Sequence, residues 1–112
     1  MRSRFGKEVQ MESVITRVVL NEGSGSEWEA AMRERMTAAE SSPGWIAGSI
    51  LTPEDDRDAR VVVGLWETRA DWERWHRVSE FRDVAGQLEG VQREHGEPTW
   101  HEVVYSGGRF PT

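Results

Sequence analysis

Four short segments of the chain have the patterns of β-strands, and in the first and last of them hydrophobic and polar positions alternate, as they do in half-buried strands. These segments are residues 13–20, 45–51, 61–66 and 99–106. The segment 61–66 is apolar at every position except Gly64, which is typical of a strand that is buried on both faces. The pattern therefore predicts four strands, of which the third is the most deeply buried.

Two longer stretches between these strands carry apolar residues at helical spacing. The first predicted helix spans about residues 26–40, and a second helical region, longer or broken, spans about residues 68–92. Each begins with a pattern typical of a capping box, in which a hydroxyl residue is followed three positions later by an acidic residue. The two pairs are Ser26 with Glu29 and Thr68 with Asp71.

The predicted order of elements is therefore βαββαβ. This order is that of a ferredoxin-like α+β fold, with a four-stranded antiparallel sheet and its helices on one face. Because the third strand is apolar on both sides, the other face of the sheet needs a cover that the chain does not supply. A second copy of the chain is the economical cover, since twofold pairing is the commonest form of association. We therefore predict a homodimer in which sheet packs against sheet.

The length of 112 residues suits one domain. Residues 13–106 form the predicted domain, residues 1–12 are expected to be a flexible leader, and residues 107–112 a tail. No apolar run is long enough to span a membrane and none resembles a secretory signal, so a cytoplasmic location is expected by default.

Composition excludes several classes of function. The chain has no cysteine, which rules out disulfides and thiolate sites. The net charge is −6 and Lys and Arg do not cluster, so no nucleic-acid partner is expected. Three histidines without close ligand spacing give no metal site.

Tryptophans are concentrated in residues 66–81, where three of the six in the chain fall within ten residues. Trp66 ends the third strand, whereas Trp72 and Trp75 share one face of the helix that follows. We expect these side chains to meet the same space from two sides. That space is either a packed core or interface, or a cavity in which a flat aromatic molecule stacks on the indole rings.

With these elements in place, the chain resembles the antibiotic biosynthesis monooxygenase family, whose fold is a dimeric α+β barrel. The resemblance covers about residues 13–106. It rests on three marks in order: the turn at residues 42–45 (Ser-Pro-Gly-Trp), the strand end at residues 66–68 (Trp-Glu-Thr), and the helix with Trp72 and Trp75 that leads to Ser79 and Phe81. Together these marks specify the fold family better than its chemistry.

The resemblance implies a monooxygenase that needs no flavin or metal and oxidises a flat polycyclic phenol or anthrone. Trp66 matches a tryptophan implicated in the site of anthrone-type oxygenases, while Val62 stands where one such enzyme has asparagine. For the haem-degrading members, Trp75 matches a helix tryptophan. Thr16 stands near their site asparagine and Val84 near their iron-ligating histidine, so haem degradation is disfavoured unless another histidine ligates the iron.

The candidate site residues follow from these observations. Trp66, Trp72, Trp75 and Phe81 are candidates to line the substrate cavity, with packing of the core as the alternative for each. His76 and His101 are the candidate bases, the latter if its face of the last strand points into the barrel. Their alternative is a structural histidine. Thr16 is a candidate polar contact for the substrate anion or a locally bonded core residue, and His95 is expected to lie in a loop without a role.

Two other functions stay open from the sequence. One is a haem-binding or haem-degrading protein in which His76 or His101 is a displaced iron ligand. The other is a non-catalytic ligand-binding module on the same fold.

Overall fold

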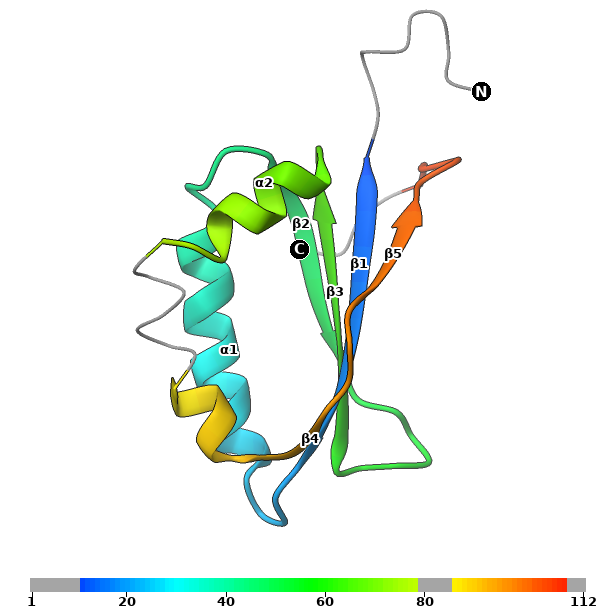
Figure 1. Cartoon of the computed structure of the whole chain (residues 1–112). Coiled ribbons are helices and arrows are strands. Elements are labelled where there is room, and N and C mark those ends of the chain that lie inside the picture. Colours follow the sequence, from blue (N-terminus) through cyan, green and yellow to red (C-terminus); the bar gives the residue numbers. More distant parts are fainter. Residues whose placement is uncertain (1–10, 79–85, 109–112) are drawn as a thin grey trace, which may run out of the picture.

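Strands and helices follow each other along the chain in the order β1, α1, β2, β3, α2, β4 and β5 (Figure 1). The computed structural model describes residues 11–78 and 86–108, and residues 86–90 are also helical. The bounds are β1 Glu12–Leu20, α1 Gly25–Ala39, β2 Trp45–Leu51, β3 Ala59–Trp66, α2 Arg69–Trp75, β4 Gln92–His95 and β5 Thr99–Glu102. Because β1 begins at Glu12, it takes in the last residue of the predicted leader.

The strands form one antiparallel sheet in the order β2-β3-β1-β4, and β5 also pairs with β1. Strands β4 and β5 lie along the same edge of β1, β4 beside its C-terminal end and β5 beside its N-terminal end. Figure 1 shows α1 and α2 on one side of this sheet. The predicted ferredoxin-like α+β class is therefore confirmed.

The last edge of the sheet differs from the prediction. Residues 92–95 form β4, where the sequence predicted the end of a helix at about residue 92 and then a loop, and β5 ends at Glu102 instead of Ser106. Between the two strands, the Gly96 N–H donates to the Arg17 carbonyl at 2.8 Å, and a Cβ at Gly96 would lie 2.9 Å from that oxygen. Pro98 has no N–H to donate, so the edge is split into two short strands.

The two predicted capping boxes have different outcomes. The Thr68 hydroxyl accepts from the Asp71 N–H at 3.0 Å, so α2 begins as predicted. Helix α1 instead begins at Gly25, and its N-cap Ser24 makes no side-chain capping bond. The prediction at Ser26 was wrong because the helix begins at Gly25, so that Ser26 lies inside its first turn. The Glu29 carboxylate accepts from the guanidinium of Arg60 at 2.9 Å.

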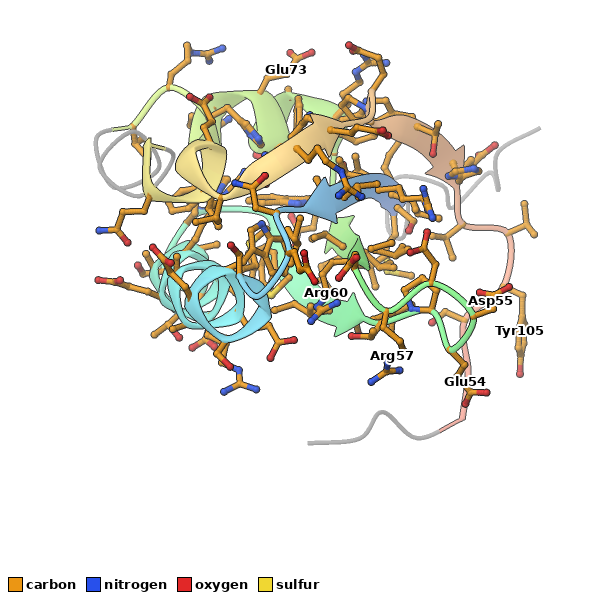
Figure 2. All side chains as sticks on the ribbon, turned by 90° about the horizontal axis from the view of Figure 1, so that it is seen from below. Glu54, Asp55, Arg57, Arg60, Glu73 and Tyr105 are labelled. Atoms are coloured by element: carbon orange, nitrogen blue, oxygen red, sulfur yellow. The ribbon has the colours of Figure 1, made fainter. Side chains whose placement is uncertain are left out.

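The ion pair between Arg60 and Glu29 fixes the first turns of α1 to β3. The Arg60 side chain also donates to the carbonyls of Arg57 and Ala59, each at 2.8 Å. Figure 2 shows Arg60 close to α1, whereas Glu54, Asp55 and Arg57 project outward from the loop between β2 and β3. Burial of this one charge is thus compensated by three bonds.

The core lies between the sheet and the helices, in two clusters. The first joins β1 to α1 and the second joins the sheet to α2. The buried members of the first are Val18, Leu20, Trp28, Ala31, Met32, Leu88 and Val91, and those of the second are Val14, Ala39, Trp66 and Trp75.

The opposite face of the sheet has no helix over it among the described residues (Figure 1). Side chains alternate along β3, and Val61, Val63 and Leu65 on this face are half-buried, whereas Gly64 and Trp66 on the helix side are buried. Within a single chain, β3 is therefore not buried on both faces as the sequence suggested.

Candidate functional site

A cavity of about 290 Å³ lies between the sheet and the two helices. Three strands, both helices and the segment around β4 contribute its walls. Its lining residues are Val14, Thr16, Val18, Trp28, Met32, Arg35, Met36, Ala39, Trp45, Val62, Gly64, Trp66, Trp72, Trp75, His76, Glu89, Gln92, His95 and Pro98. The wall is mostly apolar and aromatic with a few polar groups, as is usual for a site that binds a small organic molecule.

Two glycines on neighbouring strands make room for indole rings at the aromatic end of the cavity. Gly48 of β2 pairs with Gly64 of β3. A Cβ at Gly48 would lie 2.5 Å from Cη2 of Trp45, and a Cβ at Gly64 would lie 3.2 Å from Nε1 of Trp66. The glycines therefore let these two rings lie close to the sheet.

Tryptophan rings pack edge to face around this end of the cavity. Trp66 is 2 % exposed, and its ring meets that of Trp45 edge to face, with centroids 5.2 Å apart. On α2, Trp72 packs edge to face against Trp100 of β5 at 4.9 Å. Trp75, 4 % exposed, belongs to the same buried cluster as Trp66. Edge-to-face contacts of this kind restrict ring motion, so the aromatic wall is largely preformed.

A pair of polar side chains, Arg35 and His76, lies on the helical wall. The Arg35 Nη2 is 3.1 Å from Nε2 of His76, and Nδ1 of His76 is 2.8 Å from the carbonyl oxygen of Trp72. That carbonyl can only accept, so Nδ1 carries a proton, and a neutral ring then accepts the Arg35 N–H at Nε2. The imidazole also lies against the Trp72 ring, with centroids 3.7 Å apart.

Burial keeps this histidine neutral. Desolvation lowers the pKa of His76 to about 4, the nearby charge of Arg35 adds to this, and the bond to Trp72 opposes it. Burial also lowers the pKa of Arg35, to about 10, so the guanidinium remains cationic at neutral pH. The pair therefore presents one positive charge beside a neutral imidazole at the cavity wall.

Comparison with known proteins assigns this architecture to a family. The model of the family described as "Antibiotic biosynthesis monooxygenase" matches residues 11–87, more than half of the chain. The chain belongs to the antibiotic biosynthesis monooxygenase family. The match spans β1 to α2 and most of the cavity wall, and it confirms the resemblance drawn from the sequence. No curated protein matches the chain.

Solved structures of the same fold agree with the family assignment. A protein from Nitrosomonas europaea, described as an antibiotic biosynthesis monooxygenase, has a TM-score of 0.80 at 17% identity, over 88% of this chain and 94% of its own. A protein of the same description from Chloroflexus aurantiacus has a TM-score of 0.72 at 20% identity, over 89% and 97%. SnoaB from Streptomyces nogalater, a cofactor-independent oxygenase, has a TM-score of 0.71 at 14% identity, over 89% and 97%. At these identities the likeness shows the fold alone.

Most of the predicted site residues of this family member lie together at the cavity. Trp66, Trp72, Trp75, His76 and Thr16 all line it. Thr16 lies there because it pairs with Val62 across β1 and β3 on the helix side of the sheet.

His101 is separated from this group. Its neighbour Trp100 pairs with Val14 and packs with it into the core, so alternation along β5 places His101 on the other face of the sheet. There it pairs with Ser13 and is exposed. Phe81 and Val84 lie outside the described residues.

Three residues of the site were missed from the sequence. Arg35 is a charge within the apolar stripe of α1 that also holds Trp28, Met32 and Ala39, and that placement was the available signal. Trp45 follows the Ser-Pro-Gly turn, and its ring lies over Gly48. His95, expected in a loop without a role, ends β4 and lies at the margin of the cavity.

Neither a membrane-spanning helix nor a metal cluster is found in the part of the chain that the structure describes. Its helices are too short or too polar to cross a bilayer, and within residues 11–78 and 86–108 no three His, Asp or Glu side chains are grouped closely enough to hold a metal. As for iron, ligation by His76 would require breaking one of its two hydrogen bonds.

Proposed function

We propose that this protein is a cofactor-independent monooxygenase that oxidises a flat phenol or anthrone-like molecule in the cavity between sheet and helices. The observation that carries the proposal is the conjunction of a tryptophan-lined cavity with a single Arg–His pair in its wall. Membership of the family and the shared fold of SnoaB support it.

The shape of the cavity favours a small planar substrate. A volume of about 290 Å³ is at the lower end of the range for ligand pockets, roughly 300–1,000 Å³. Indole faces and edges from β2, β3 and α2 can stack on an aromatic ring system and exclude water from it. Thr16 adds one hydroxyl to the sheet side of the wall.

The chemistry requires only the substrate, dioxygen and proton transfers. Loss of a proton from an anthrone gives an electron-rich anion, which passes one electron to dioxygen. The resulting radical and superoxide combine at the ring carbon to form a peroxide. After protonation, the peroxide loses water to leave a carbonyl, so that CH₂ and O₂ become C=O and H₂O.

Within this scheme His76 is the proton acceptor. It lies at the cavity, whereas His101 is on the other face of the sheet. Burial lowers the pKa of His76 to about 4 in the folded protein, and a substrate anion formed beside the ring would raise this pKa by stabilising the imidazolium. The proton would go to Nε2, which would first have to separate from Nη2 of Arg35, 3.1 Å away. The tryptophans hold the substrate and keep the anion away from bulk water.

Oxygen uptake with an anthrone, above the rate of spontaneous oxidation, tests the proposal. Two matched variants locate the site: His76→Gln should lower the rate by roughly one to two orders of magnitude, and His101→Gln should not. Trp66→Phe should raise KM by shrinking the stacking surface. Wild-type protein that gives no uptake above background would exclude the activity and favour a ligand-binding module.

The proposal extends to a homodimer formed through the open face of the sheet. Half-buried Val61, Val63 and Leu65, together with Leu51 at 48 % exposure, form an apolar strip there. Sedimentation equilibrium should give twice the chain mass. A charge in the strip, Val63→Glu, should shift the protein to monomer, while Thr37→Glu on the exposed side of α1 should not. A wild-type monomer at micromolar concentration would contradict this assembly.

A further inference from the structure

A tryptophan in the core holds the side-chain amide of Gln92 in a fixed orientation at the cavity wall. Trp28 of α1 is 0 % exposed, and its Nε1–H donates to Oε1 of Gln92 in β4 at 2.9 Å. Because an indole nitrogen can only donate, the amide oxygen must face Trp28. The amide NH₂ group is thereby left for a different partner.

This NH₂ group has two N–H donors and is accessible. Within residues 11–78 and 86–108, no acceptor for it is found. No side-chain nitrogen or oxygen of these residues is both fully buried and without a partner, so the NH₂ group is not sealed in the core. Gln92 is half-buried and lines the cavity beside Trp28. Its donors are therefore placed to bind an acceptor atom of a molecule in the cavity.

The Gln92 amide and the His76 ring lie at different positions along the cavity. Gln92 is bonded to Trp28 in the first turn of α1, whereas His76 is bonded to Arg35. These two residues of α1 are seven positions apart, which corresponds to about 10 Å along a helix axis. Figure 1 shows α2 beside the C-terminal part of α1 and the segment that leads into β4 beside its first turns, and the two core clusters agree.

The charges around Gln92 favour a neutral acceptor over an anion. Glu89 also lines the cavity, and a carboxylate repels an anionic oxygen. A second, more open hollow of about 340 Å³ shares Gln92, Glu89 and His95 with the cavity and adds Arg93 and Glu94. Since Arg93 and Glu94 carry opposite charges, they leave the effect of Glu89 in place. A carbonyl oxygen can accept the amide N–H without that repulsion.

We propose that the Gln92 amide donates a hydrogen bond to a carbonyl oxygen of the substrate, so that the protein selects planar aromatic ketones over hydrocarbons of the same shape. This inference deepens the proposed function and rests on it for taking the cavity as the substrate site. In an anthrone, the carbonyl lies across the central ring from the CH₂ group that is oxidised. A carbonyl held at Gln92 thus turns the CH₂ group toward the part of the cavity that contains His76.

Two ligands that differ in one group separate this contact from catalysis. We choose 9-fluorenone, a planar ketone without a CH₂ group, and fluorene, the hydrocarbon of the same ring system. Quenching of tryptophan fluorescence gives the Kd of each ligand. Comparing the ratio of the two Kd values between protein variants cancels the different hydration of the ligands. The infrared C=O stretching frequency of bound fluorenone reports the contact directly, because an accepted hydrogen bond lowers it.

Gln92→Glu removes the donors and keeps the contact with Trp28. At neutral pH a carboxylate still accepts the indole N–H, but it has no N–H to donate. Gln87→Glu is the matched control, because Gln87 is exposed in the preceding helical turn, does not line the cavity and gains the same charge. Thermal unfolding checks that each variant is folded.

The expected results follow from the loss of one hydrogen bond. In the wild type, the C=O stretch of bound fluorenone should lie below its value in an alkane solvent. Gln92→Glu should return the stretch toward the alkane value and reduce the preference for fluorenone over fluorene by roughly three- to tenfold. Gln87→Glu should change neither.

An alkane-like C=O stretch in the wild type would overturn the inference. This measurement uses only the wild type, so it decides the matter even if Gln92→Glu does not fold. An equal preference for fluorenone in the wild type and in folded Gln92→Glu would overturn the inference as well.

Oxygen uptake with an anthrone distinguishes this inference from the proposed function. A preference for fluorenone that depends on Gln92, without any oxygen uptake, would support the carbonyl contact and contradict the monooxygenase. Uptake with an unchanged KM for the anthrone in Gln92→Glu would support the monooxygenase and contradict the carbonyl contact.

Discussion

The Arg35–His76 pair predicts a distinct dependence of stability on pH. Burial lowers the pKa of His76 from 6.5 to about 4 in the folded protein. Between about pH 6.5 and pH 4, the unfolded chain therefore binds a proton at this residue that the folded protein does not. The unfolded state holds more protons in this window, so stability rises with pH across it and is lost as the pH falls. His76→Gln should remove this contribution.

The size of the effect follows from the two pKa values. A difference between 6.5 and about 4 corresponds to at most about 3.5 kcal/mol, since each unit is about 1.4 kcal/mol. The ring is only partly buried, and solvent screening reduces that figure to about 1–2 kcal/mol. Most of it should be lost by about pH 5, before the majority of carboxylates begin to titrate.

Urea unfolding at several values between about pH 5 and pH 7.5 measures this directly. The wild type should lose about 1 kcal/mol more than His76→Gln over that range, whereas a His101→Gln control should follow the wild type. Parallel curves for wild type and His76→Gln would show that the imidazole is not held neutral by its surroundings. An NMR titration in which the His76 ring protonates near pH 6.5 would refute the reasoning independently.

Three further changes test individual contacts of the fold. Gly48→Ala should destabilise the protein by about 1–2 kcal/mol, because its Cβ would lie 2.5 Å from Cη2 of Trp45. In a double-mutant cycle measured by urea unfolding, Trp45→Phe should recover part of that loss. Additive effects of the two changes would show that the two side chains do not clash. Glu29→Ala should cost about 1–3 kcal/mol by removing the counter-charge and the hydrogen-bond acceptor of Arg60, which is 8 % exposed. Glu29→Gln should cost less because an acceptor oxygen remains, and equal losses in thermal unfolding would show that this hydrogen bond contributes nothing beyond the charge. Thr68→Ala should lower the free energy of unfolding by about 1 kcal/mol, because the hydroxyl that accepts from the Asp71 N–H is lost. Thr68→Ser keeps a hydroxyl and should retain the wild-type stability in the same thermal unfolding experiment.

Local sequence patterns predicted the elements that depend on near neighbours. Strand patterns in the sequence located β1, β2 and β3 to within two residues at each end, and the Thr68 side chain caps α2 as its spacing indicated. The capping box expected at Ser26 shows the limit of local patterns. Its second member, Glu29, instead forms an ion pair with Arg60, 31 residues away. A capping pattern describes a local preference, and a buried arginine from another strand outweighs it.

For the candidate site too, the sequence predicted some residues and left the position of others open. The tryptophans were visible as a cluster in the sequence, and Trp66, Trp72 and Trp75 do line one cavity. The phase of the last strand stayed open, because the alternation of Trp100 and His101 is equally compatible with either face pointing inward. Pairing of Trp100 with Val14 resolves that choice, and it moves His101 away from the cavity.

The sequence by itself thus determined the α+β class, the order of the elements and the aromatic character of the site, because apolar periodicity and turn residues act over a few positions. Only the tertiary structure decided which polar groups face the cavity. Arg35 and His76 are 41 residues apart, and their contact exists because α2 crosses α1. The low pKa of His76 arises from the burial that this packing creates, whereas its tautomer is set locally by the carbonyl of Trp72, four residues earlier. The reactive character of the site is therefore a property of how the helices pack, which no local pattern in the chain records.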